Sequence, residues 1–200
     1  MQSDWHAMAP DEAAFEDGTL NFLAIPDVEF GLSWIEDVGI DTISRRVRSL
    51  VGWLLDQLDS LRHTNGAPMT RVYGPRDTTA RGGTVVFNFL DPSGAVIDER
   101  LVAAESAAAG FSLRTGCFCN PGAGEGAFGI TPASLRGNLG RRTLTIDEYL
   151  ESLRLPSGGA IRVSFGMVST VADVQRFLAY ARTYRDRSVN QAGLPPRTRC

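Results

Sequence analysis

The sequence contains no lysine: lysine and arginine together number 20, and all 20 are arginine. The side-chain amine is therefore missing, and with it the covalent catalysis in which lysine forms a Schiff base with a carbonyl substrate or an aldehyde cofactor. A GC-rich coding bias is the simplest cause of this composition. Whatever the cause, no side chain of this sequence can supply the amine of a Schiff base.

Cysteine and histidine are also scarce. The three cysteines, Cys117, Cys119 and Cys200, are too few and too poorly spaced for a disulfide framework, and a bridge across one intervening residue would be strained. The two histidines, His6 and His63, lie far upstream of the cysteines, which disfavours a zinc site. The pattern fits free thiols in a reducing compartment.

The chain has no polybasic run, no long uninterrupted apolar stretch and no secretory leader pattern at its beginning. Its formal net charge of -3 argues against a nucleic acid or an anionic membrane as its main partner. We therefore expect a cytoplasmic protein that binds neither. With 200 residues, 43% of them hydrophobic, the chain can bury the core of one globular domain.

Hydrophobic periodicity and capping residues predict an alternation of helices and strands. The expected fold class is α/β, in the α+β form of a mixed sheet covered by helices on one face. Residues 1–26 are expected to form an extended lead-in, 27–187 the domain, and 188–200 a disordered tail. The predicted helices span 27–38, 41–64, 96–109, 145–154 and 170–184, and the predicted strands span 84–90, 111–115 and 160–164.

The strongest local signal is RTGCFCNPG, from Arg114 to Gly122, where two thiols flank Phe118 ahead of a glycine-rich loop over 116–126. A cysteine in a polar loop beside an arginine can have a lowered pKa, and the thiolate is the nucleophilic form. Two buried or incidental cysteines would give the same pattern. From the residues alone, the two interpretations carry similar weight.

Arg162 stands in the otherwise apolar strand IRVSFG and needs an anion to offset its desolvation. A substrate carboxylate would serve, although an ion pair with an internal Asp or Glu is the commoner arrangement. Gly18 and Thr19 form a Gly-Thr pair that could cradle a phosphate or simply make a turn.

These pieces occur together, in an order that resembles the class V aminotransferases, in particular the C-terminal half of molybdenum cofactor sulfurases and cysteine desulfurase-like proteins. The likeness spans about residues 15–184 and is most specific at the cysteine motif. The segments that carry it are FEDGTLNFLAIP, NGAPMTRVYGP, VVFNFLD, LRTGCFCNPGA and IRVSFGMVSTVADVQRFL.

The resemblance implies the small domain of a fold-type I enzyme that uses pyridoxal 5'-phosphate and whose missing large domain carries the cofactor lysine. In this family, residues at the positions of Gly18 and Thr19 reach the cofactor phosphate of a neighbouring subunit, which implies a homodimer. The catalytic cysteine lies five positions after the arginine of the RTG segment, which matches Cys119 to Arg114. The resemblance also implies that Arg162, together with Arg114, receives the substrate carboxylate.

The implied reaction takes sulfur from L-cysteine, leaves a persulfide on Cys119 and releases alanine. Related sulfurases often carry a further cysteine where this chain has Gly124, and the sulfur acceptor stays open. Two alternatives also stay open. The first is a class V aminotransferase, epimerase or lyase in which the cysteine loop only shapes the pocket. The second is a truncated, non-catalytic dimerisation or binding module.

Overall fold

The computed structural model describes residues 10–15, 19–117, 120–136, 145–155, 157–188, 194 and 196–197. The chain divides into two compact units, Met1–Thr42 and Ile43–Cys200. The expected tail over 188–200 lies mostly outside the described residues. None of the helices in the described part combines the length and apolar composition needed to cross a membrane.

The first unit consists of short helical elements followed by one long helix. These are the 3-10 turns η1 (Glu12–Phe15) and η2 (Phe22–Ala24) and the helix α1 (Ile25–Val38). Proline in the first turn of α1 has the backbone angle that a helix start requires. The helix ends where Gly39 adopts a φ of +89°, a conformation that favours glycine. The predicted break at Gly39 is confirmed, and α2 (Ile40–Ser60) begins directly after it.

The second unit is built on a four-stranded sheet in the order β1-β2-β4-β3. Its strands are β1 (Thr70–Tyr73), β2 (Thr84–Phe89), β3 (Arg114–Gly116) and β4 (Ala160–Ser164). All three pairings are antiparallel, so the fold class is confirmed but the sheet is not mixed. The reason is that β4 inserts between β2 and β3, which run in the same direction and would have been parallel neighbours without it.

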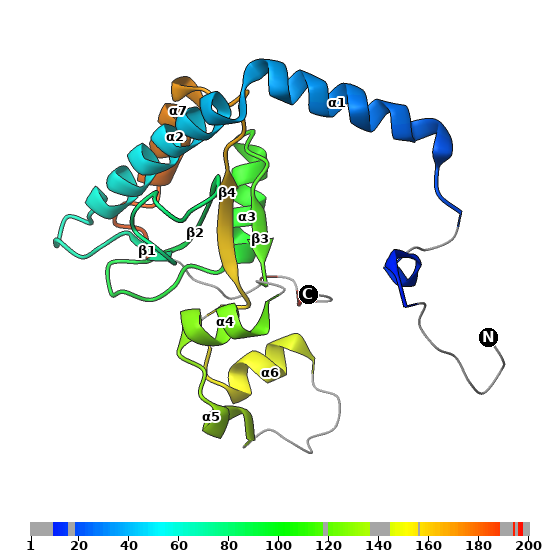
Figure 1. Cartoon of the computed structure of the whole chain (residues 1–200). Helices are drawn as coiled ribbons and strands as arrows, with labels where there is room; N and C mark the ends of the chain where they lie inside the picture. Colours follow the sequence, from blue (N-terminus) through cyan, green and yellow to red (C-terminus); the bar gives the residue numbers. More distant parts are fainter. Residues whose placement is uncertain are drawn as a thin grey trace, which may run out of the picture. The chain divides into compact units, whose positions relative to one another are not determined.

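One face of this sheet is covered by helices, with α2 and α7 (Val171–Arg182) on the same side in Figure 1. Alternate residues of each strand point to this face, and in β2 these are Val85, Phe87 and Phe89, all fully buried. The helix α3 (Glu99–Ala108) adds Val102 to the same core. Facing side chains from α2 are Leu50, Leu54 and Leu58, and those from α7 are Val174, Phe177 and Leu178.

Local capping signals located several elements closely. The strand β4 has the predicted bounds, and both α6 (Ile146–Ser152) and α7 begin with complete capping boxes, at Thr145 and Thr170. The helix α3 starts later than predicted because the Asp98 side chain accepts a hydrogen bond from the Arg100 N–H and caps it.

The glycine-rich loop expected over 116–126 is helical from its second half onward. Its second half lies in the helix α4 (Pro121–Phe128), and α5 (Pro132–Arg136) comes next. The Asn120 side chain accepts a hydrogen bond from the Ala123 N–H over 3.2 Å, and proline occupies the first turn. An Asn-Pro start satisfies the first backbone donors and fixes a helical φ, which outweighs the weak helix propensity of glycine here.

Candidate functional site

The face of the sheet opposite α2 and α7 carries a row of side chains that crosses all four strands. In the strand register, Tyr73 lies opposite Val86, Val86 opposite Arg162, and Arg162 opposite Arg114. Residues paired directly across strands project to the same face. The register therefore brings together the two arginines that the sequence singled out, although 47 intervening residues separate them in the chain.

The guanidinium of Arg162 is the most unusual group in this row. Its Nε and Nη2 atoms are buried and have no hydrogen-bond partner among the described residues. No carboxylate of the described residues forms an ion pair with it. A desolvated cation without a partner is costly, and no hydrogen bond from the described residues to these two nitrogens offsets that cost.

Arg114 is exposed and lies directly across the strand pair from Arg162. Like charges at opposed positions of an antiparallel pair repel each other and destabilise the pairing. An anion bound between the two guanidinium groups would convert this repulsion into attraction. The geometry therefore favours one shared anion site over two independent surface charges.

The cysteine motif follows β3 directly. The half-buried Cys117 comes immediately after Gly116, which has a φ of +105°. Gly159 at the start of β4 lies so close that an added Cβ would overlap the carbonyl oxygen of Gly116 and the backbone nitrogen of Cys117. This contact holds the base of the motif against the sheet. Cys119 lies outside the described residues.

The two residues expected at the cofactor phosphate belong to the first unit. Gly18 lies outside the described residues, and Thr19 is exposed. The structure therefore describes the arginine pair as one group but not its relation to this Gly-Thr pair.

Sequence reasoning missed Arg197, whose side chain is only 11% exposed. It donates through Nε to Glu99 over 2.9 Å, through Nη2 to Asp98 over 2.7 Å, and through Nη1 to Asp147 over 2.5 Å. Its backbone N–H also donates to Asp147 over 2.9 Å. No periodic pattern marks this residue, because its partners are distant in sequence and come together only in the fold.

Two acidic partners of Arg197, Asp98 and Asp147, have a pKa below the ordinary value of an aspartate. Burial alone would raise the pKa of Asp98, but hydrogen bonds from Arg100 and the charge of Arg197 lower it below its ordinary value. Burial would also lower the pKa of Arg197, yet its hydrogen bonds to Glu99 and Asp147 raise it. The group is thus a fully paired ionic cluster.

Ser157 connects this ionic cluster by hydrogen bonds to Gly159, which packs against the base of the cysteine motif. The Ser157 hydroxyl lies within hydrogen-bond distance of both the Glu99 carboxylate and the carbonyl oxygen of Gly159, 2.9 Å away, and these two acceptors share its single proton. The Asn88 amide donates to the same carbonyl over 3.1 Å. Because Gly159 packs against Gly116, the C-terminal Arg197 contributes to the position of the cysteine motif.

His63 has a structural position, as its distance from the cysteines suggested. It is buried, with Nε2 3.0 Å from the Leu90 carbonyl oxygen and Nδ1 accepting from the Asp186 N–H over 3.0 Å. Within the described ranges, no three His, Cys, Asp or Glu side chains gather as a metal site would require.

Known proteins resemble this chain over most of its length. Residues 4–177 match the aminotransferase class-V family. The chain is 36% identical to a molybdenum cofactor sulfurase from Drosophila ananassae over 180 residues, covering 84% of this chain. It is 34% identical to one from Solanum lycopersicum over 188 residues, covering 94% of this chain. The matched region is 23% of the length of each of these relatives.

A solved structure supports the same fold. The apo cysteine desulfurase from Thermococcus onnurineus superposes with a TM-score of 0.58 at 22% identity, covering 91% of this chain and 36% of that one. At this identity the likeness concerns the fold alone. Together with the family match and the sulfurase relatives, it confirms the resemblance inferred from the cysteine motif. The chain belongs to the class V aminotransferase family.

Proposed function

We propose that this chain is the C-terminal part of a cysteine desulfurase or sulfurtransferase that uses pyridoxal 5'-phosphate and is incomplete alone. The observation that carries the proposal is the guanidinium of Arg162, whose Nε and Nη2 atoms are buried without a partner among the described residues. An amino-acid substrate has a carboxylate that can accept two parallel hydrogen bonds from such a planar fork. The cysteine desulfurase of similar fold favours L-cysteine as that amino acid.

The two opposed arginines orient this substrate. Arg162 binds the carboxylate from the sheet, and Arg114 adds a second positive charge from the neighbouring strand. With one end of a small amino acid fixed in this way, its other groups can adopt few positions. The arginine pair thereby directs the substrate thiol toward the cysteine motif that follows β3.

Cys119 is the proposed nucleophile and persulfide carrier. Its thiolate attacks the sulfur of cysteine, so that a sulfur–sulfur bond forms as the carbon–sulfur bond of the substrate breaks. The carbon fragment keeps the electron pair, takes up one proton and leaves as alanine. The cationic Arg114, five positions earlier, favours the thiolate form.

The residues present do not fit the cofactor by themselves, because the chain has no lysine for the Schiff base. When bound to a lysine-bearing portion of the enzyme, pyridoxal phosphate supplies an electron sink for substrate carbon. The part that this chain would contribute is Gly18 and Thr19, which would contact the cofactor phosphate of a neighbouring subunit in a homodimer.

The first unit offers a surface for the lysine-bearing portion. No residue of α1 is buried, and Leu23, Phe30 and Trp34 are 91%, 76% and 48% exposed. Leu23 belongs to η2, and Phe30 and Trp34 belong to α1, which follows it directly. Exposed apolar side chains gathered on neighbouring elements mark a contact surface. The relatives are about four times longer than the region they share with this chain, which supports a larger polypeptide as the partner of α1.

A fusion protein tests this proposal. The portion of the Drosophila ananassae relative that lies outside the matched region is fused ahead of this chain as the proposed source of the cofactor lysine, and sulfide release from L-cysteine is measured. Cys119→Ser should abolish sulfide release and leave cofactor absorbance intact, whereas the matched control Cys117→Ser should retain part of the activity. In the isolated chain, Cys119 should be alkylated faster than Cys117, because an arginine-stabilised thiolate reacts faster than a half-buried thiol.

Three outcomes would contradict the assignment. If Cys117→Ser is inactive and Cys119→Ser remains active, the roles of the two thiols are reversed. If both variants turn over normally, neither thiol is the nucleophile, and the aminotransferase, epimerase or lyase alternative replaces the desulfurase. A chain that binds its partner without any turnover would be the non-catalytic module.

A further inference from the structure

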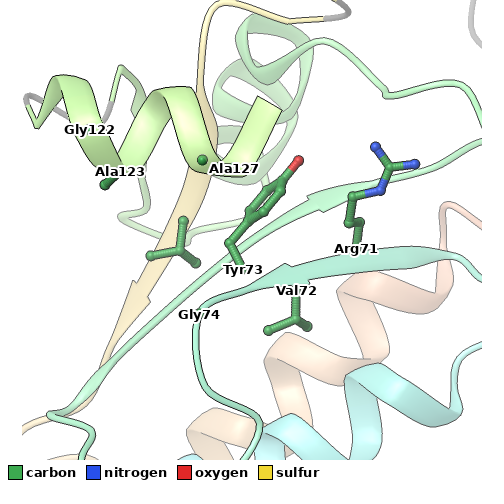
Figure 2. Close-up of a pocket in the computed structure, with 9 residues that line it drawn as sticks. Arg71, Val72, Tyr73, Gly74, Gly122, Ala123 and Ala127 are labelled. Atoms are coloured by element: carbon green, nitrogen blue, oxygen red, sulfur yellow. The ribbon is translucent and has the colours of Figure 1, made fainter. Parts of the chain in front are cut away.

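A cavity of 580 Å³ lies between β1 and α4 (Figure 2). It is lined by the Tyr73 end of the row of side chains that crosses the sheet to Arg114. Arg71, Tyr73 and Val86 line it from the sheet. The opposite wall is one side of α4, with Gly122, Ala123, Gly126 and Ala127. This volume lies within the range of cavities that hold small molecules.

The wall formed by α4 leaves the cavity open. Its residues are spaced four apart in two pairs, so they lie on one face of the helix, and none has a side chain larger than a methyl group. A Cβ added at Gly126 would meet no atom within 4 Å. The space therefore exists because this helix face is small, and no described side chain of the protein fills it.

The wall formed by β1 supplies positive charge and a flat apolar surface. Figure 2 shows Arg71 and Tyr73 rising from the strand toward α4, while Val72 points to the other side of the sheet. The Tyr73 ring packs edge-on against Phe128 at 5.8 Å, which fixes its orientation. The lining residues include no Asp or Glu, so Arg71 determines the charge of the cavity.

The Tyr73 phenol does not alter this charge. Burial raises its pKa, and the nearby positive charge of Arg71, which favours ionisation, does not reverse that shift. The hydroxyl is therefore neutral at physiological pH, and the lining carries one net positive charge.

We propose that this cavity is a second binding site, for a small molecule with a flat apolar body and one oxyanion, either a carboxylate or a phosphate monoester. Arg71 binds the oxyanion through its planar fork, and the body lies between the Tyr73 ring and the small-residue face of α4. Val86 separates Tyr73 from Arg162 in the row across the sheet, so this site is adjacent to the substrate arginine without including it.

The site also lies next to the cysteine motif in sequence. The helix α4 begins after its cap Asn120, which directly follows Cys119. A ligand held against α4 would therefore touch the element that the proposed persulfide carrier precedes. The binding itself does not depend on the proposed function, because it uses neither the cysteines nor a cofactor.

The isolated chain suffices for the test. Backbone amide NMR shifts are followed while benzoate, phenyl phosphate or the uncharged benzyl alcohol is added. Both anions should shift the amides of Gly74, Gly122 and Gly126 in a saturable manner, and benzyl alcohol should not. The difference between benzoate and phenyl phosphate identifies which oxyanion the site prefers.

Variants locate the ligand. Arg71→Gln should raise the Kd by at least about tenfold, since a charge-assisted hydrogen bond is lost. Gly126→Leu should abolish binding by filling the cavity, with folding checked from the dispersion of the amide signals. The control Arg48→Gln removes an exposed arginine of α2 and should leave the Kd unchanged.

Three results would overturn the site. The first is the absence of any saturable shift with either anion in a folded chain. The second is an equal loss of affinity from Arg48→Gln and Arg71→Gln, which would indicate general attraction of anions. The third is a loss with Arg162→Gln but none with Gly126→Leu, which would place the anion at Arg162. None of these readouts involves sulfur release, so failure here leaves the proposed function untouched.

Discussion

Two arginines with buried nitrogens stand in opposite situations in this molecule. Arg197 donates to Asp98, Glu99 and Asp147 and is surrounded by the charges it needs. Arg162 has two buried nitrogens and no partner among the described residues. The guanidinium of Arg197 is thus neutralised by carboxylates of the protein itself, whereas none of the described carboxylates neutralises that of Arg162.

This difference in pairing suggests different roles for the two arginines, with Arg197 stabilising the fold and Arg162 proposed to bind a ligand. Buried polar groups in folded proteins are nearly always hydrogen-bonded, so Arg197 needs no explanation beyond stability. A buried cation that the rest of the domain leaves unpaired destabilises the fold, and it is retained where a ligand supplies its partner. The comparison predicts that loss of Arg197 affects folding and loss of Arg162 affects substrate use.

Breaking the paired arginine should have the largest effect. Arg197→Gln leaves the buried carboxylates of Asp98 and Glu99 without their common cation, which should lower the free energy of unfolding by about 3 kcal/mol. Urea unfolding followed by circular dichroism measures this loss. The exposed Arg48 provides the control, since Arg48→Gln should change stability by less than about 0.5 kcal/mol. Equal stabilities for the two variants would mean that the ionic cluster contributes nothing.

Replacing the unpaired arginine should act on catalysis. In the fusion protein, Arg162→Lys should lower kcat/KM for cysteine by about tenfold to a hundredfold, because an ammonium cannot reproduce the bidentate fork. Its unfolding free energy should stay close to that of the parent chain. The steady-state kinetics of both proteins decide the point, and unchanged kinetics would return Arg162 to a purely structural role.

The smallest expected effect is that of acid, which protonates the carboxylates around Arg197. It should reduce the difference in unfolding free energy between the parent chain and Arg197→Gln. The pKa of Asp98 is lowered from its ordinary value of 3.8, so its charge stabilises the fold above that pH and stops doing so as the pH falls through the lower, folded-state value. The stability gap between the parent chain and Arg197→Gln should therefore narrow below about pH 4. Urea titrations at pH 7 and below pH 4 measure the gap, and a constant gap would contradict the charged pairing.

The predictable part of the fold was local. The helix α2 shows its apolar spacing, α6 and α7 begin at capping boxes, and Gly39 ends α1, because each signal involves residues within a few positions of one another. The strand β1 was missed because its four residues alternate buried and exposed over too short a length. The helix α4 was missed because glycine content outweighed the Asn-Pro start in the sequence-based interpretation.

The sequence by itself determined which chemical groups are available: two neighbouring thiols, arginine as the only basic side chain, and the motif that indicates the family. Only the tertiary structure decided which arginines are buried and which of those are paired. Strand register places Arg162 opposite Arg114. Arg197, close to the C-terminal end of the chain, packs against the start of α3, and this brings it into contact with Asp98 and Glu99. These pairings depend on contacts between distant segments, and whether a buried charge is paired is a property of its surroundings rather than of its place in the sequence.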